Sequence, residues 1–310
     1  MQLTNRRVHL MGTVIDVSIY HKQPEPLLDQ VEELLNLYNK RFSANDDSSE
    51  LMKINKAAGL HPVKIHPELF ELISLGKWHS CQPGSHLNIA IGPLIQTWRI
   101  GFSDARLPFP EEITLLLDII NPNAIVLSEE NQSVFLQEKG MKIDLGALAK
   151  GYIADRIADY LKAENVTSAL INLGGNILTF GPALHNPDQK WRIGIQNPKE
   201  TRNTNLVVLA IRDQSVVTSG IYERTFEIDG KTYHHIFDSQ TGYPVSSDLA
   251  SLTIISSLSV DGEIWTTRLF GPSLERIFQE VSSQPNLEAI IVDKDNHCFQ
   301  TAGIYKIRLS

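Results

Sequence analysis

The chain has 310 residues, of which 42% are hydrophobic and 21% charged, the composition of a globular protein long enough for one large domain or two closely packed ones. The formal net charge of −8, without runs of Lys or Arg, argues against nonspecific binding of nucleic acid, so we expect no nucleic-acid partner. The two cysteines, Cys81 and Cys298, form no metal-binding spacing, and we expect reduced thiols. No segment is apolar enough to span a membrane, and the N-terminus has neither a signal-peptide core nor a lipoprotein cysteine. We therefore expect a cytoplasmic protein, unless a leader has been removed.

The N-terminal half mixes strand and helix patterns. Along residues 26–41, apolar residues recur at helical spacing with acidic residues opposite. The polar loop that follows contains Ser48 and Ser49, either of which could cap a short helix. This loop is either a plain connection or a source of hydroxyls and amides for a polar ligand. In chain order, we expect a strand at 9–20, helices at 26–41 and 67–80, and a hairpin of strands at 124–128 and 133–137.

Residues 142–155 predict a short strand, a turn of small residues and the start of a helix. The first amides of a helix have no partner within the helix and carry partial positive charge, so this arrangement favours an anion. Lys150 at the helix start is well placed for a phosphate, and the glycine at 146 lets a ligand approach the backbone. The alternative is an ordinary turn between a strand and a helix, with Lys150 on the surface.

The C-terminal half reads mainly as strands. Two adjacent glycines end a buried strand at 169–176, and Asp229-Gly230 predicts a tight hairpin turn. Strands joined by hairpins imply antiparallel sheets with helices laid on them, so the expected fold class is α+β. The expected elements are strands at 169–176, 191–196, 205–211, 216–220, 224–228, 232–237, 252–255, 288–292 and 305–309, and a helix at 263–281 broken near Gly271-Pro272.

Polar residues of this half suggest chemistry. His234 and His235 are adjacent in a strand and face opposite sides, and His235, just before an apolar pair, is the better candidate for a general base. Glu263 and Thr267 lie four residues apart, so on a helix they share a face that suits a hard cation such as Mg²⁺. The alternative for this pair is a Glu at a helix N-terminus and an exposed Thr.

Taken in order, the motifs resemble those of the ApbE-like FAD:protein FMN transferases, over nearly the whole chain from Met11 to about Gly271. Each motif alone is weak, but the ordered set is highly specific. The motifs are Met11-Gly-Thr; Phe42-Ser with Ser49-Glu-Leu; Gly92-Pro-Leu with Trp98; Asp144-Leu-Gly-Ala-Leu-Ala-Lys-Gly-Tyr with Asp155; Asn172-Leu-Gly-Gly-Asn-Ile; Thr218-Ser-Gly; Tyr222-Glu-Arg-Thr-Phe; His235-Ile-Phe-Asp with Thr241-Gly and Pro244; and Thr267.

The resemblance implies a fold, an activity and a site. The fold would be α+β with antiparallel sheets flanked by helices, similar to the T-fold, in one domain over residues 1–310 made of two packed lobes with FAD between them. The activity would be Mg²⁺-dependent transfer of FMN from FAD to a Thr or Ser hydroxyl of a target flavoprotein, with release of AMP. The resemblance assigns the metal to the Ala147 carbonyl, Glu263 and Thr267, the general base to His235, and FAD binding to Met11, Asn45, Asn88, Ile89, Ala90, Asp144, Lys150, Ser219, Gly220 and Phe237.

Three departures from the family pattern keep alternatives open. Asn45 stands where the family usually has an aromatic residue, and residues 88–90 lack the usual carboxylate and hydroxyl. Glu263 stands where the family usually has a metal-binding Asp, and Asp261 is the rival ligand. The alternative functions are an FAD pyrophosphatase that gives FMN and AMP, and a noncatalytic FAD-binding protein.

Overall fold

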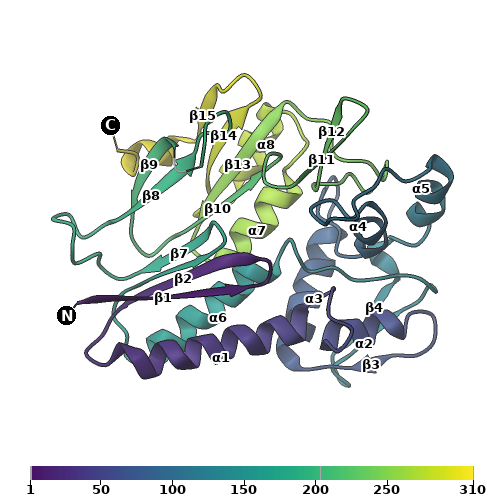
Figure 1. Cartoon of the computed structure of the whole chain (residues 1–310), viewed down its shortest axis with the longest axis horizontal. Helices are drawn as coiled ribbons and strands as arrows, with labels where there is room; N and C mark the ends of the chain where they lie inside the picture. The colour runs from purple at the N-terminus through teal and green to yellow at the C-terminus, as the bar shows by residue number, and fades with distance from the viewer. Residues whose placement is uncertain (1, 203, 310) are drawn as a thin grey trace.

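An eight-stranded antiparallel sheet organises the structure, a computed structural model that describes residues 2–202 and 204–309 (Figure 1). The strand order is β1-β2-β6-β7-β10-β13-β14-β15, and every neighbouring pair is antiparallel. One inner strand is buried along its whole length, because all eight residues of β13 are buried. The strands are β1 (Leu3–Leu10), β2 (Thr13–Tyr20), β6 (Ala169–Leu173), β7 (Asn176–Phe180), β10 (Ser215–Gly220), β13 (Leu249–Ser256), β14 (Glu288–Asp293) and β15 (Cys298–Gln300).

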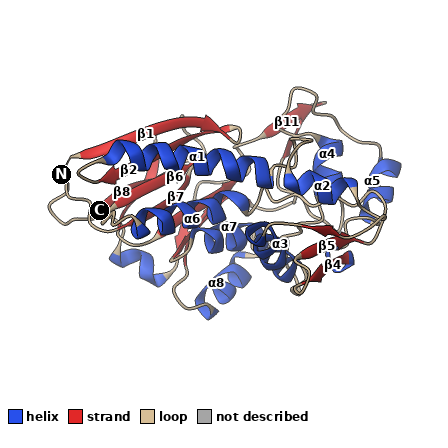
Figure 2. Ribbon diagram, turned by 90° about the horizontal axis from the view of Figure 1, so that it is seen from below, coloured by secondary structure: helices blue, strands red, loops and turns tan. Residues whose placement is uncertain are grey.

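Helices cover one face of this sheet, as Figure 2 shows for α1, α6 and α7. Helix α1 (Pro24–Phe42) begins with prolines in its first turn and buries one apolar stripe, including Leu28, Val31 and Leu35. Helix α6 (Ala149–Ala163) packs on β6 and β7, and α7 (Ser259–Arg268) packs on β10 and β13. Helix α8 (Leu274–Ser283) packs on β14, with Ile277 and Val281 buried.

The opposite face is covered by the hairpin of β8 (Trp191–Gln196) and β9 (Asn205–Ile211) and by the 3-10 helix η2 (Ala302–Lys306). Trp191 and Ile193 point into a second apolar cluster against the sheet residues Val216, Ile255 and Ile290. The sheet is therefore buried on both faces, which explains why β13 and β14 are buried without alternation along the strand.

The second part of the molecule lies beside the helical layer and holds the middle of the chain (Figure 1). Its apolar cluster centres on Trp98, whose ring lies 5.3 Å from Tyr233 and 5.7 Å from Phe237. Trp98 Nε1 also donates to Gly242 O (2.9 Å), which ties α4 to the segment after β12. The elements are α2 (Glu50–Lys56), α3 (Pro67–Ser80), α4 (Gly92–Trp98), α5 (Pro110–Leu117), the 3-10 helix η1 (Pro122–Ala124), β3 (Val63–Lys64), β4 (Ile125–Ser128), β5 (Ser133–Leu136), β11 (Thr225–Ile228) and β12 (Lys231–His234).

The expected α+β class with antiparallel sheets flanked by helices is confirmed, and so are the helices at 26–41 and 67–80 and the two hairpins. Ser49 is the residue that caps α2, by accepting from Met52 N (3.0 Å). The division into two packed lobes stays a prediction.

Several expected elements are wrong in detail. Residues 9–20 are not one strand, because Met11 (φ 55°) and Gly12 (φ 69°) turn the chain between β1 and β2. The expected strand before Gly146 is only an isolated bridge of Lys142 with Ile91. Two expected strands end early: the one at 169–176 is β6 followed by a turn and the start of β7, and the one at 232–237 ends with β12 at His234. The expected helix at 263–281 begins at Ser259 and is separate from α8. Helices α4 and α5 were not expected, and η2 lies where a strand was expected at 305–309.

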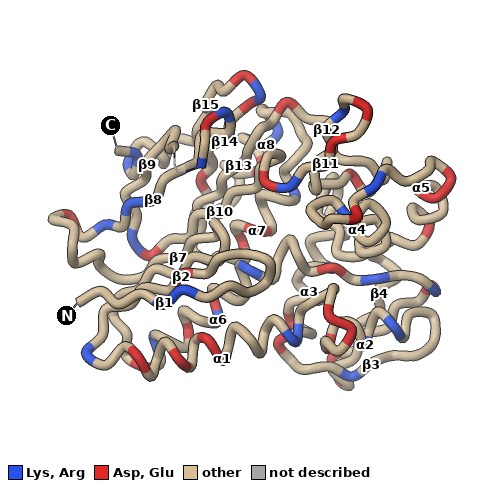
Figure 3. The backbone as a smooth tube through the Cα atoms, in the orientation of Figure 1, with Lys and Arg blue, Asp and Glu red and all other residues tan. Residues whose placement is uncertain are grey.

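Among residues 2–202 and 204–309, no helix combines the length and apolarity needed to cross a membrane. Lys and Arg are interspersed with Asp and Glu over the whole trace in Figure 3. The absence of a nucleic-acid partner stays a prediction.

Candidate active site

The N-termini of α6 and α7 meet at a close backbone contact (Figures 1 and 2). A Cβ atom at Gly151 would lie 2.5 Å from Ser259 O, so only glycine permits this approach. The buried Asp155 carboxylate accepts from Ser259 N (2.8 Å) and Val260 N (2.9 Å), which pairs two orphan amides of α7. Burial raises the pKa of Asp155 to about 6, although these two hydrogen bonds oppose the shift. Asp155 and Gly151 thus hold the N-termini of α6 and α7 together, and we call this contact the helix junction.

Lys150 and Glu263 join the two helices at this contact. Lys150 Nζ lies 2.7 Å from Glu263 Oε1, and Asn176 Nδ2 donates to the same oxygen at 2.9 Å. Glu263 is only 4% exposed, so its charge depends on these two partners. Asn176 is itself fixed, because its Oδ1 accepts from Ser259 Oγ. The structure therefore brings Lys150 and Glu263 into direct contact, although they are 113 residues apart in the chain.

The oxygens expected to hold a cation are open. Within the part of the chain that the structure describes, no hydrogen bond reaches Glu263 Oε2, Thr267 Oγ1 or the Ala147 carbonyl. Glu263 and Thr267 share a face of α7, whereas Asp261 lies about 200° around the helix from Glu263, on the other side. Three unpartnered oxygen atoms of this kind fit Mg²⁺, which prefers oxygen ligands. Of the two carboxylates, only that of Glu263 lies on the face of α7 that carries Thr267, and its role as a metal ligand stays a prediction.

His235 follows β12 and faces the carbonyl of Arg224, with Nδ1 3.3 Å from Arg224 O. A carbonyl can only accept, so Nδ1 carries the proton and Nε2 keeps the free lone pair. Burial lowers the pKa of His235 to about 4, and the nearby charges of Arg224 and Lys150 add to the shift. The imidazole is therefore neutral at neutral pH and can accept a proton at Nε2.

Arg224 is a site residue that the sequence reasoning missed. Its positive charge acts on both His235 and Asp144. Burial raises the pKa of Asp144, while the hydrogen bond from Gly146 N (2.8 Å) and the charge of Arg224 oppose this. The tight turn at Asp229-Gly230 sets the hairpin register, with Thr225 opposite His234. That register places Arg224 beside His235 and could have been read from the sequence.

Other expected FAD-binding residues lie at one end of the main sheet. Met11 is in the turn between β1 and β2, and Ser219 and Gly220 end β10. The strand register puts both positions at the sheet end where Asn176 begins β7. This end of the sheet is therefore continuous with the Lys150–Glu263 contact.

The segment 88–90 runs beside Asp144, whose N–H donates to Ile89 O (2.9 Å). The side chain of Asn88 is 8% exposed and is engaged internally, since Nδ2 donates to Ile120 O and Oδ1 accepts from Ala90 N, both at 2.8 Å. The side chain of Asn88 thus holds the backbone of residues 88–90 in place. Any contact with FAD would fall to other atoms of residues 88–90.

Two of the expected FAD-binding residues make no hydrogen bond or ion pair with the other candidate site residues that the structure describes. The Phe237 side chain is 6% exposed and packs against Trp98 in the core of the second part. Asn45 lies on the exposed loop between α1 and α2, where its N–H donates to Ser43 Oγ (3.2 Å). Within the described residues, no hydrogen bond or ion pair links Asn45 to the other candidates, and its role stays a prediction.

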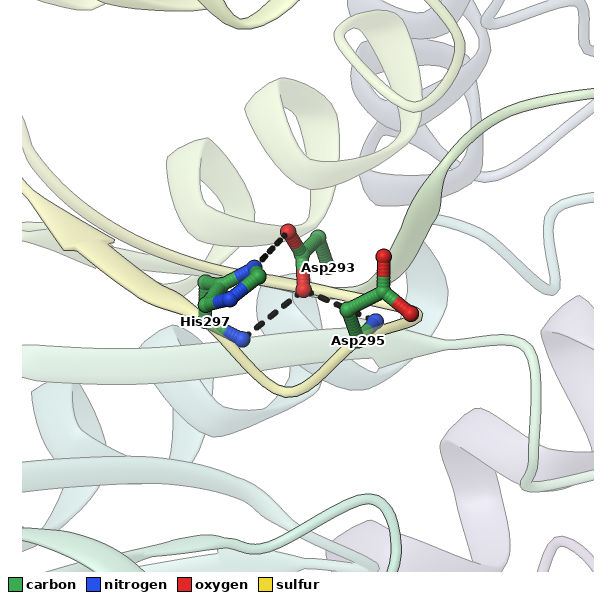
Figure 4. Close-up of side chains that lie close together, drawn as sticks. All are labelled: Asp293, Asp295 and His297. Carbon is green, nitrogen blue, oxygen red and sulfur yellow. Dashed lines mark hydrogen bonds and ion pairs between the residues drawn. The ribbon is translucent and has the colours of Figure 1, made fainter.

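One further cluster is close enough in space for a metal ion, and it lies apart from these residues, in the turn between β14 and β15 (Figure 4). It consists of Asp293, Asp295 and His297. The Asp293 carboxylate accepts from the backbone N–H of Asp295 (2.9 Å) and of His297 (2.8 Å), and Oδ2 lies 2.8 Å from His297 Nδ1. These bonds close the turn, and they account for the cluster without a cation.

The fold and the site together define an α+β protein built around two helix starts, a buried carboxylate and a neutral histidine. The chain matches the family model described as "ApbE family" over residues 11–291, and it belongs to this family. A protein of Klebsiella pneumoniae (strain 342) named FAD:protein FMN transferase is 44% identical over 286 residues, covering 92% of this chain and 88% of that protein. A protein of the same name from Treponema pallidum (strain Nichols) is 34% identical over 310 residues, covering 95% of this chain and 86% of that protein.

Solved structures show the same fold. The ApbE protein of Thermotoga maritima superposes with a TM-score of 0.91 at 24% identity and covers all of both chains. The flavin transferase ApbE of Vibrio cholerae superposes with a TM-score of 0.85 at 21% identity and covers 99% of each chain. The expected ApbE architecture is therefore confirmed, while the FAD groove between the lobes stays a prediction.

Proposed function

We propose that this chain is an FAD:protein FMN transferase, which moves FMN from FAD to a Thr or Ser hydroxyl of a target flavoprotein and releases AMP. Its membership of the ApbE family and the shared name of its relatives support this function. The observation that carries it within the structure is the hydrogen bond of His235 Nδ1 to Arg224 O (3.3 Å), because it leaves Nε2 free to accept a proton. The charge of Lys150 also acts on this ring. A base and a phosphate-binding cation are what a hydroxyl needs to attack a pyrophosphate.

The reaction divides among the residues as follows. The acceptor hydroxyl oxygen bonds to the phosphorus of the FMN half, and the bond from that phosphorus to the bridging oxygen breaks, so AMP leaves with the bridging oxygen. His235 Nε2 takes the hydroxyl proton, because Nδ1 already carries one against Arg224 O. Lys150, in the first turn of α6, balances the charge of the phosphates.

Mg²⁺ would be held by the Ala147 carbonyl, Glu263 and Thr267, and when bound it supplies neutralisation of the phosphate oxygens. The FAD-binding roles of Met11, Asp144, Ser219 and the segment 88–90 belong to the same proposal. So do a cytoplasmic location and a soluble or membrane-attached flavoprotein as acceptor.

An FAD pyrophosphatase is the second candidate. It uses the same site but gives the FMN phosphoryl group to water. The exposed Asn45, in place of the family's usual aromatic residue, favours it, because less of the flavin nucleotide would be covered.

The test measures AMP release from FAD by chromatography, with Mg²⁺ or chelator, and with or without a candidate acceptor domain whose intact mass is recorded. The transferase predicts AMP that requires both Mg²⁺ and acceptor, with the acceptor heavier by one FMN. His235→Asn should abolish transfer, whereas the matched change His61→Asn, at an exposed histidine outside the site, should not. Free FMN and AMP without acceptor would establish the pyrophosphatase. Bound FAD without AMP under every condition would leave a noncatalytic binding protein.

A further inference from the structure

The Lys150–Glu263 ion pair is unequal in its surroundings. The Lys150 side chain is 30% exposed, whereas that of Glu263 is only 6% exposed. A buried carboxylate needs a compensating positive charge, and within the described residues Lys150 is the only cationic side chain in contact with it. The ammonium therefore supplies the charge that a metal ion would otherwise supply at this carboxylate.

The carboxylate is held in this position by its neighbours. Asn176 donates to Glu263 Oε1 and is held in turn by Ser259, while Ser259 Oγ also accepts from Ser215 Oγ (3.1 Å). A Cβ atom at Gly262 would lie 2.5 Å from Val217 Cγ2, so α7 lies tightly against β10 at the same level. Of the two partners, the long lysine side chain is the more exposed and the less constrained by hydrogen bonds.

We propose that Lys150 is a built-in counter-ion of Glu263, which competes with Mg²⁺ for this carboxylate until the phosphates of FAD give the ammonium a second partner. An ammonium and a divalent cation repel strongly at the short distances of a shared carboxylate, so metal binding requires Lys150 to turn away. This inference rests on the metal site of the proposed function. It adds that the free enzyme binds Mg²⁺ weakly and that FAD strengthens Mg²⁺ binding through Lys150 as well as through its own phosphates.

The test compares Lys150→Met with Lys162→Met by calorimetric titration of Mg²⁺ at pH 7.5 without FAD. Lys162 lies in the last turn of the same helix, with Nζ 5.1 Å from the centre of the Phe180 ring, so its loss changes the net charge equally but leaves Glu263 paired. Lys150→Met should bind Mg²⁺ about tenfold more tightly than the unmodified protein, because an unpaired buried carboxylate is left for the cation. Lys162→Met should bind it within about twofold of the unmodified protein. In the same samples, Mg²⁺ should raise the Tm of Lys150→Met more than that of either other protein.

A second measurement needs no variant. Brief acetylation with N-hydroxysuccinimidyl acetate, read by peptide mass, should modify Lys150 of the unmodified protein faster with Mg²⁺ than with chelator. Equal Mg²⁺ affinities of all three proteins, weaker binding to Lys150→Met, or acetylation of Lys150 that Mg²⁺ leaves unchanged would overturn the inference while leaving the transferase intact. No Mg²⁺ binding to any of the proteins would instead remove the metal site from the proposed function, and the inference with it.

Discussion

Asp155 is the residue whose loss should most directly loosen the helix junction. Its two carboxylate oxygens accept from Ser259 N and Val260 N at 2.8 and 2.9 Å, and Asp155 is only 5% exposed. Asp155→Ala leaves two buried N–H groups unpaired, at a cost of about 2–4 kcal/mol for the pair. Part of this cost is recovered at neutral pH, because the unfavourable burial of the charged carboxylate is removed as well. We expect a net loss of about 2 kcal/mol in the free energy of unfolding at pH 7.5.

The pH dependence follows from the raised pKa of Asp155, about 6 in the folded protein against its usual 3.8. Because the folded state binds this proton more tightly, the resulting stability is fully present below the unfolded pKa and is lost as pH rises through about 6. Asp155→Ala has no such proton to bind. Its deficit relative to the unmodified protein should therefore be about 1.4 kcal/mol larger at pH 5 than at pH 7.5.

The assay is urea unfolding of both proteins at the two pH values, followed by tryptophan fluorescence and circular dichroism with matching m-values. The matched control is Asp159→Ala on the exposed side of the same helix, where the carboxylate is 59% exposed in an ion pair with Arg156 and should contribute less than about 1 kcal/mol. The reasoning is refuted if Asp155→Ala loses no more stability than this control. It is also refuted if the deficit is larger at pH 7.5 than at pH 5.

Three further predictions concern the helix junction, the histidine His235 and the proposed metal ligands. The Cε1 proton signal of His235 should stay fixed from pH 5.5 to 8, since its pKa is about 4, and a midpoint near 6.5 would contradict the burial argument. Gly151→Ala would bring a Cβ atom to 2.5 Å from Ser259 O, so urea unfolding should show a loss of about 1–3 kcal/mol, and a loss below about 0.5 kcal/mol would mean that the helices can part freely. Calorimetry should show Mg²⁺ binding weakened more than about tenfold by Glu263→Gln but changed less than about twofold by Asp261→Asn, and the reverse result would make Asp261 the ligand.

Local patterns predicted much of the fold. The helices at 26–41 and 67–80 were recognisable because apolar residues at helical spacing make a buried stripe, and the turn at Asp229-Gly230 because its residue types suit a tight hairpin. The first hairpin was missed because Met11, not a common residue at positive φ, makes the turn together with Gly12. Strand β7 was missed because Gly174-Gly175 suggested an ending rather than a two-residue turn between paired strands.

The candidate site likewise contains one contact that local sequence patterns predict and one that they do not. Arg224 and His235 are close because a hairpin of known register sets them opposite each other, which is local information. The contact of Lys150 with Glu263 is different in kind, since the two residues come from separate helices 113 positions apart in the chain. Only the resemblance to a family joined them, and no spacing rule could have given the 2.7 Å between their charged groups.

The contact between Lys150 and Glu263 also explains how the chain accommodates a glutamate at position 263, where the family usually has an aspartate. A glutamate has one more rotatable bond than an aspartate, so the position of its carboxylate oxygens is less well defined unless other groups hold it. Asn176 and Lys150 both bond to Oε1, so the carboxylate is held from one side, while Oε2 accepts no hydrogen bond within the described residues. Since Asn176 belongs to the β6–β7 hairpin and Lys150 to α6, the position of Glu263 depends on the packing of sheet and helices together. A site of this kind forms only when both layers have folded.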